Sequence, residues 1–144
     1  MSRTEDVAVA SGLFVDSSGW IALASARDRQ HAEAERVIRD ALRIRSRLFT
    51  TNLVLAEVHR WLLFRSGPVP ARAALVRIDQ SGALELAFAT PEHHQAALTW
   101  LARFSDQHFS YTDAVSFAVM QAIRCDVALT FDRDFTVAGF RRVP

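Results

Sequence analysis

Four acidic residues stand where their carboxylates could act together on one substrate. Asp16 follows the apolar run LFV and Asp132 follows ALTF, so each lies at the carboxyl end of a short predicted strand. Glu57 lies within the helical pattern TTNLVLAEVHRWLLF, and Asp113 lies at the start of the pattern TDAVSFAVM. An oxygen-only cluster of this kind suits a hard divalent cation such as Mg²⁺ or Mn²⁺. The four acids together therefore indicate a metal site.

Each acid also has an ordinary structural explanation. An aspartate after a strand is a common turn or cap residue, and the helix macrodipole favours an acid at the position of Asp113. Glu57 has Leu53 one turn before it and Trp61 one turn after it, which predicts that its carboxylate points along the core-facing side. A buried carboxylate needs a basic partner such as Arg60, a raised pKa or a metal ion.

The composition excludes several other chemistries. The chain has 144 residues, of which 50% are hydrophobic and 23% charged, as in a single globular domain. All 17 basic residues are arginine, so a P-loop, a Schiff-base lysine and the lysine of a phospho-acceptor module are absent. The net charge of +1 gives no overall basic field. Four arginines fall near one side of a predicted helix and just after its end, and we call them the arginine stripe: Arg36, Arg39, Arg43 and Arg47. The stripe either contacts RNA or is a solvated helix face.

The single cysteine, Cys125, favours a cytoplasmic protein, because it cannot form an intramolecular disulfide. No apolar segment approaches the ~18 residues that span a bilayer. We expect residues 1–11 to form a loose tail and residues 12–144 a single domain.

Short apolar runs alternate with segments of helical period, which predicts an α/β domain with a parallel sheet. In such a sheet, ligands bind at the carboxyl ends of the strands, where Asp16 and Asp132 lie. The expected strands are Leu13–Asp16, Leu48–Thr51, Ala83–Ala87, Val127–Thr130 and Phe140–Val143. The expected helices are Gly19–Ala24, His31–Arg45, Leu53–Phe64, Ala71–Asp79, Pro91–Phe104 and Thr112–Arg124, with a short turn at Arg133–Ala138. Thr90 before Pro91 predicts the start of a helix, and the segment SGP at residues 66–68 predicts the end of one.

The segments FVDSSGWIAL, TTNLVLAEV, YTDAVSFAVM and ALTFDRDF, in this order, resemble the PIN domain of the VapC ribonuclease toxins. The resemblance implies a three-layer α/β/α fold around a central, mainly parallel five-stranded sheet. It implies that Asp16, Glu57, Asp113 and Asp132 are the catalytic, metal-binding acids. It also implies Asp134 as a fifth carboxylate and Thr130 as a hydroxyl that helps hold water or phosphate.

The function implied by this resemblance is that of the toxin in a type II toxin–antitoxin system. Such an enzyme is an endoribonuclease that uses Mg²⁺ or Mn²⁺ to activate a water and hydrolyse RNA phosphodiester bonds. Its implied partners are the RNA substrate and a cognate antitoxin, and a homodimer is also implied.

Two alternatives belong to other classes. One is a catalytically silent PIN-like module that binds RNA or protein. The other is a phosphatase of the haloacid-dehalogenase type, which uses a nucleophilic aspartate after a strand. That chemistry needs a second aspartate two residues later, where this chain has Ser18.

Overall fold

The computed structural model describes residues 12–144, so the tail predicted for residues 1–11 lies outside the described residues. Within the described part, five strands form one sheet in the order β3-β2-β1-β4-β5, and every neighbouring pair is parallel. The strands are β1 (Leu13–Val15), β2 (Leu48–Thr51), β3 (Leu84–Ala87), β4 (Val127–Leu129) and β5 (Arg141–Val143). The predicted five-stranded sheet is confirmed.

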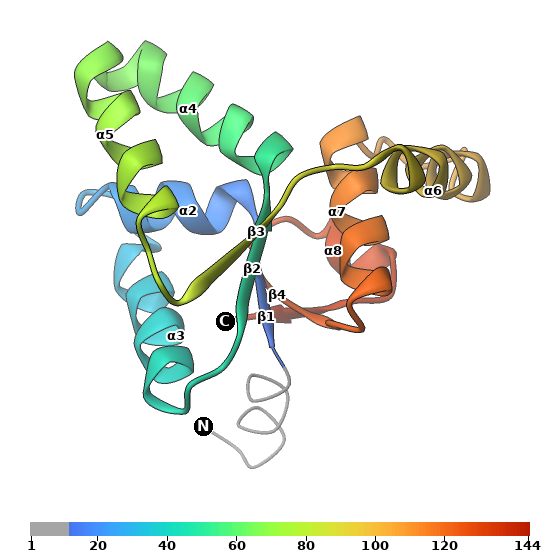
Figure 1. The fold of residues 1–144 in the computed structure, drawn as a ribbon, viewed down its shortest axis with the longest axis horizontal. Coiled ribbons are helices and arrows are strands. Elements are labelled where there is room, and N and C mark those ends of the chain that lie inside the picture. Colours follow the sequence, from blue (N-terminus) through green and yellow to red (C-terminus); the bar gives the residue numbers. More distant parts are fainter. Residues whose placement is uncertain (1–11) are drawn as a thin grey trace.

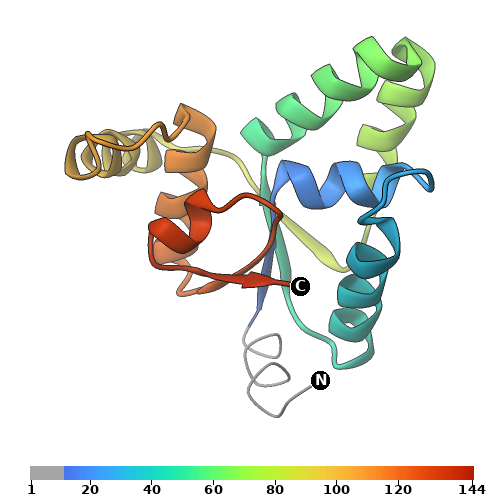
Figure 2. The ribbon, with the colours of Figure 1, turned by 180° about the vertical axis from the view of Figure 1, so that it is seen from behind.

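Helices cover both faces of the sheet, which gives the three layers expected for this fold (Figures 1 and 2). One face carries α2 (Ser17–Ala24), α3 (His31–Arg43), α4 (Asn52–Ser66) and α5 (Pro68–Asp79). The other carries α6 (Pro91–Arg103), α7 (Tyr111–Ala122) and α8 (Asp134–Val137). No helix within residues 12–144 combines the length and the apolar character needed to cross a membrane.

The strand residues alternate between two apolar cores. Leu13 and Val15 pack with residues of α2 and α3, whereas Phe14 between them packs in the core that contains α7. All three side chains are fully buried. Because both faces of the central strands are covered, their sequences are almost continuously apolar. The edge strand β5 differs, since Arg141 and Arg142 are exposed and Val143 is buried.

The helix boundaries follow local stop and start signals. Gly67, with φ +90°, ends α4, and α5 begins directly afterwards at Pro68 rather than at the expected Ala71. Proline suits the first turn of a helix. A backbone N–H at that position has no hydrogen-bond partner within the helix, so the N–H that proline lacks is not missed. Thr90 caps α6 by accepting a hydrogen bond from the His93 backbone, as predicted.

Candidate metal-binding active site

The strand order reverses between β1 and β4, and this places Asp16 next to Asp132. Parallel pairing of Val15 with Leu129 continues the register so that Asp16 stands beside Thr130. The Asp16 backbone N–H donates to the Leu129 carbonyl oxygen at 3.1 Å. A crevice at the carboxyl ends of strands, where their order reverses, is the usual ligand site of open α/β sheets.

Gly19 allows α2 to lie close to β4 at this point. A Cβ atom on Gly19 would come within 2.7 Å of the Leu129 carbonyl oxygen, a distance that a real side chain does not tolerate. The glycine therefore keeps the first turn of α2, which directly follows Asp16, against the neighbouring strand.

Thr130 links two of the predicted acids through hydrogen bonds. Its hydroxyl donates to Oδ2 of Asp16 at 2.9 Å, and its oxygen accepts from the Asp132 backbone N–H at 3.1 Å. The Ser18 hydroxyl lies 3.2 Å from that of Thr130 and also donates to Oδ2 of Asp16. Asp16 is only 3% exposed, so these hydroxyl groups replace the water that its carboxylate has lost.

Glu57 lies at the rim of the crevice rather than in the core. The Ser17 hydroxyl is 3.4 Å from Oδ1 of Asp16 and 3.4 Å from Oε2 of Glu57, so it lies between the two carboxylates. The expectation of a core-facing Glu57 is wrong, because the residue is exposed. The buried stripe of α4 is instead Val54, Val58 and Leu62.

Asp113 takes part in both the helix start and the acidic cluster. Ser110 and Asp113 form a capping box at the start of α7, in which Oδ2 of Asp113 accepts from the Ser110 backbone N–H at 3.3 Å. The capping role and the proximity to the other acids are therefore compatible.

Asp134 joins this cluster more tightly than the sequence suggested. Asp113, Asp132 and Asp134 each present one carboxylate oxygen, and these atoms lie within 4.8 Å of one another. Oδ1 of Asp132 accepts from the Asp134 backbone N–H at 2.9 Å, which holds the loop before α8. In the part of the chain that is described, none of these three acids forms an ion pair with a basic residue. Such an oxygen-only, unneutralised set fits a hard divalent cation.

The crowding of carboxylates is also visible in their pKa values. Burial, the largest cause, raises the pKa of Asp16 to about 6, and the nearby charges of Glu57 and Asp132 add to the shift. Burial, with the charges of Asp16 and Asp132, likewise raises the pKa of Asp113 to about 6. Glu57 is exposed as a residue, but its carboxylate is partly shielded from water beside Ser17, and this desolvation is the main cause that raises its pKa. Partial burial likewise raises the pKa of Asp134, and the charge of Asp132 adds to the shift. A bound cation would relieve this repulsion.

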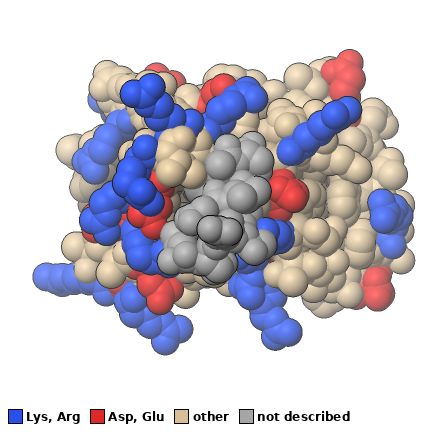
Figure 3. All heavy atoms as spheres, turned by 90° about the horizontal axis from the view of Figure 1, so that it is seen from below, with Lys and Arg blue, Asp and Glu red and all other residues tan. Residues whose placement is uncertain are grey.

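The arginine stripe lies away from the acids. The helix α3 runs toward the amino ends of the strands, and Arg47 precedes β2 at that end, which Figure 3 views from below. Arg47 binds both carboxylate oxygens of Glu85, and Arg36 pairs with Asp40 at 3.7 Å. The structure does not bring the stripe to the crevice.

The predicted metal site does not include the serines that contact its acids, although sequence signals for them exist. Ser17 and Ser18 directly follow Asp16 at the first positions of α2. The segment SYTD fits the pattern of a capping box, a serine followed three residues later by an acid, which identifies Ser110.

We expect Thr130→Val to weaken Mn²⁺ binding by ~10–100-fold, as is typical when a group that supports a metal ligand is lost. Valine keeps the shape of threonine, but it removes the 2.9 Å hydrogen bond that Thr130 donates to Asp16. Titration calorimetry with Mn²⁺ measures the change, and Thr99→Val, at an exposed threonine of α6, is the control. Equal Mn²⁺ affinity in both variants would show that Thr130 has no part in the site.

The chain is similar to known proteins in sequence. The family model of the PIN domain matches residues 13–141. The chain is 36% identical over 131 residues to the 23S rRNA-specific endonuclease VapC20 of two Mycobacterium tuberculosis strains, covering 91% of this chain and 97% of that protein. It is 27% identical over 130 residues to a VapC ribonuclease of Archaeoglobus fulgidus, covering 89% and 81%.

The fold is similar to a solved structure of the same kind. The crystal structure of Mycobacterium tuberculosis VapC20, described as a sarcin-ricin loop cleaving toxin, superposes with a TM-score of 0.80 at 34% identity. The match covers 90% of this chain and 96% of that one. The chain therefore belongs to the PIN-domain family, among the VapC ribonuclease toxins.

Proposed function

We propose that this protein is the toxin of a type II toxin–antitoxin system and cleaves RNA with Mg²⁺ or Mn²⁺. The observation that carries the metal dependence is the group of acids at the β1/β4 reversal. Burial, and to a smaller extent mutual repulsion, raises the pKa values of these acids, and within residues 12–144 none of them forms an ion pair. We assign metal binding and catalysis to the acids of this crevice: Asp16, Glu57, Asp113, Asp132 and, as a fifth carboxylate, Asp134.

The residues of the chain have distinct parts in this proposal. A divalent cation, when bound, lowers the pKa of a water and offsets negative charge on the phosphodiester. The carboxylates of Asp113, Asp132 and Asp134 converge closely enough to share one cation. Thr130 fixes the orientation of Asp16, and Ser17 spaces Asp16 from Glu57.

The relatives suggest the class of RNA. Because VapC20 of Mycobacterium tuberculosis is named for 23S rRNA and covers nearly the whole chain at 36% identity, we propose a structured loop of ribosomal RNA as the substrate. A cognate antitoxin and a homodimer belong to the same proposal. So do a single PIN domain over residues 12–144 and a cytoplasmic location, in which the buried Cys125 remains a free thiol.

Purified protein should cleave 23S rRNA within ribosomes only when Mg²⁺ or Mn²⁺ is present, and EDTA should abolish the cleavage. Gel analysis of the RNA fragments checks this, with metal added back after chelation as the control. RNA binding without cleavage under all metal conditions would favour the silent module. Hydrolysis of p-nitrophenyl phosphate with no RNA cleavage would favour the phosphatase.

A further inference from the structure

A groove of about 470 Å³ opens on α4 immediately beside the acidic crevice. It is lined by Glu57, Arg60, Trp61, Phe64 and Arg65, and we call it the α4 groove. Glu57 takes part in both the crevice and the groove, so the two adjoin at this residue. Phe64 is 76% exposed.

The aromatic rings of the groove are each paired with an arginine. The Arg60 guanidinium carbon lies 5.2 Å from the centre of the Phe64 ring, and that of Arg65 lies 4.6 Å from the Trp61 ring. Within residues 12–144 neither arginine forms an ion pair with a carboxylate. The groove therefore offers flat apolar surfaces together with positive charge that no carboxylate of the described chain neutralises.

Helical geometry aligns these pairs with the acids. Glu57, Trp61 and Arg65 follow one another at intervals of four residues, so they lie along one side of α4. Each interval advances ~6 Å along the helix axis. The side chains thus form a path that leads from the acidic crevice toward the outer end of α4.

We propose that the α4 groove is an RNA subsite in which unpaired nucleotides beside the scissile bond stack on Trp61 and Phe64. Arg60 and Arg65 would then lie near the phosphates. This inference rests on the proposed ribonuclease function and names the part of the RNA that the enzyme grips. Aromatic rings with adjacent arginines are a usual means of holding single-stranded nucleic acid, because every base has a face that can stack.

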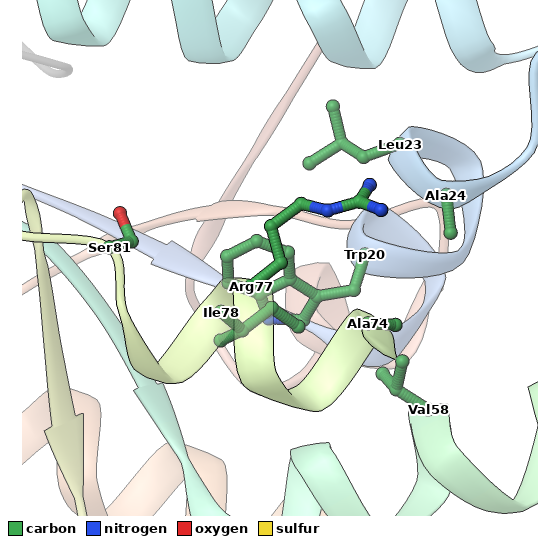
Figure 4. Close-up of a pocket in the computed structure, with 8 residues that line it drawn as sticks. All are labelled: Trp20, Leu23, Ala24, Val58, Ala74, Arg77, Ile78 and Ser81. Atoms are coloured by element: carbon green, nitrogen blue, oxygen red, sulfur yellow. The ribbon is translucent and has the colours of Figure 1, made fainter. Parts of the chain in front are cut away.

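Two other hollows within residues 12–144 lack this combination. The pocket between α2, α4 and α5, of about 260 Å³, is lined mainly by apolar side chains such as Leu23, Val58 and Ile78 and by none of the acids (Figure 4). A further groove between α4, α5 and β3 contains Phe88, Arg72 and Asp79, but none of the acids of the crevice. Only the α4 groove, among these hollows of residues 12–144, joins arginine-stacked rings to the crevice.

The test measures the affinity of the full-length protein for an RNA hairpin that carries 2-aminopurine in an unpaired loop. Binding is followed by fluorescence in EDTA, so that no cleavage occurs and repulsion from the acidic crevice is the same in every variant. We expect Trp61→Leu and Phe64→Leu each to weaken binding by ~5–100-fold and to abolish the stacking quench. Trp61→Phe, which keeps an aromatic ring, should restore most of the affinity.

Two matched controls define the specificity of the effect. Phe88→Leu removes another exposed ring, 65% accessible, from the groove that contains none of the crevice acids, and it should leave the RNA affinity unchanged. A fully paired duplex of the same length should bind the wild type and the variants alike, because its bases offer no free faces. Because Phe64 is largely exposed, Phe64→Leu tests the proposal even if Trp61→Leu disturbs the packing of α4.

Three results would overturn the proposal. They are equal affinity of wild type and Phe64→Leu for the loop RNA, equal losses for Phe64→Leu and Phe88→Leu, and equal losses on loop and duplex RNA. A change in molar mass by light scattering, with RNA affinity intact, would assign the groove to a second copy of the chain instead. Cleavage assays on the wild type and the same variants separate the proposed RNA subsite from the proposed ribonuclease function. Wild-type protein that binds the loop RNA without cutting it contradicts only the ribonuclease function.

Discussion

Asp16→Asn should reduce RNA cleavage by ~10³-fold or more and at the same time stabilise the metal-free protein. Stabilisation of transition-state charge by a bound cation is worth several kcal/mol, which corresponds to a loss of this size when the cation is held wrongly. Asp16 is 3% exposed and its pKa is raised to about 6, so at neutral pH its ionised form destabilises the fold. Asparagine has nearly the same shape without the charge, and we expect a gain of ~1–3 kcal/mol in unfolding free energy.

Cleavage rates and thermal melts with and without Mn²⁺ measure both effects on one preparation. Asp126→Asn is the matched control, because Asp126 is an exposed acid at the opposite end of β4 and should affect neither property. The wild type should melt at a higher temperature with Mn²⁺, and the Asp16 variant should lose most of this gain. If the Asp16 variant keeps the full Mn²⁺ stabilisation, the crevice is not the metal site.

The metal-free protein should be more stable near pH 5 than near pH 8. Asp16 and Asp113 both have a pKa of about 6 in the folded protein, above the ordinary value of 3.8. Between these values the folded state holds more protons than the unfolded state, so stability falls as the pH rises through this window. Above about pH 7 both states are ionised and the loss is complete, at ~2–4 kcal/mol in total once the coupling of the two carboxyls is considered.

Urea unfolding between pH 5 and pH 8 in EDTA measures this dependence. Mn²⁺ should stabilise the protein more at pH 8 than at pH 5, because the cation binds the ionised carboxylates. Asp16→Asn in EDTA should show a smaller change across the same range. Stability that rises from pH 5 to pH 8 without metal would mean that these carboxylates are not destabilised by burial and mutual repulsion.

The sequence by itself determined the sheet and the position of its acids along the chain. Apolar runs such as LFV and VAL are local features, and an acid after each run lies at the carboxyl end of a parallel strand. The cap at Thr90 and the break at Gly67 were likewise predictable, since a cap needs only a hydroxyl near the first free amides and the SGP break places a glycine directly before a proline. The start of α5 at Pro68 shows the limit of such signals. The residues that end α4 also begin α5, so the sequence predicts the break but not that a new helix follows at once.

Only the tertiary structure decided which groups meet. The helical period shows that Glu57 shares a side of α4 with Trp61. However, α4 packs against the core through Val54, Val58 and Leu62, so the side that carries Glu57 lies at the rim of the crevice. The register of β1 against β4 places the Thr130 hydroxyl on Asp16, and the turn after Asp132 brings Asp134 into the tight cluster.

The arginines show the same division. The spacing of Arg36 and Arg43 predicts a shared helix side, yet α3 runs toward the amino ends of the strands and carries them away from the acids. Arg60 and Arg65, which form no comparable stripe in the sequence, lie in the groove beside Glu57. Periodicity fixes which residues share one face of an element, whereas the direction and packing of that element fix what the face meets.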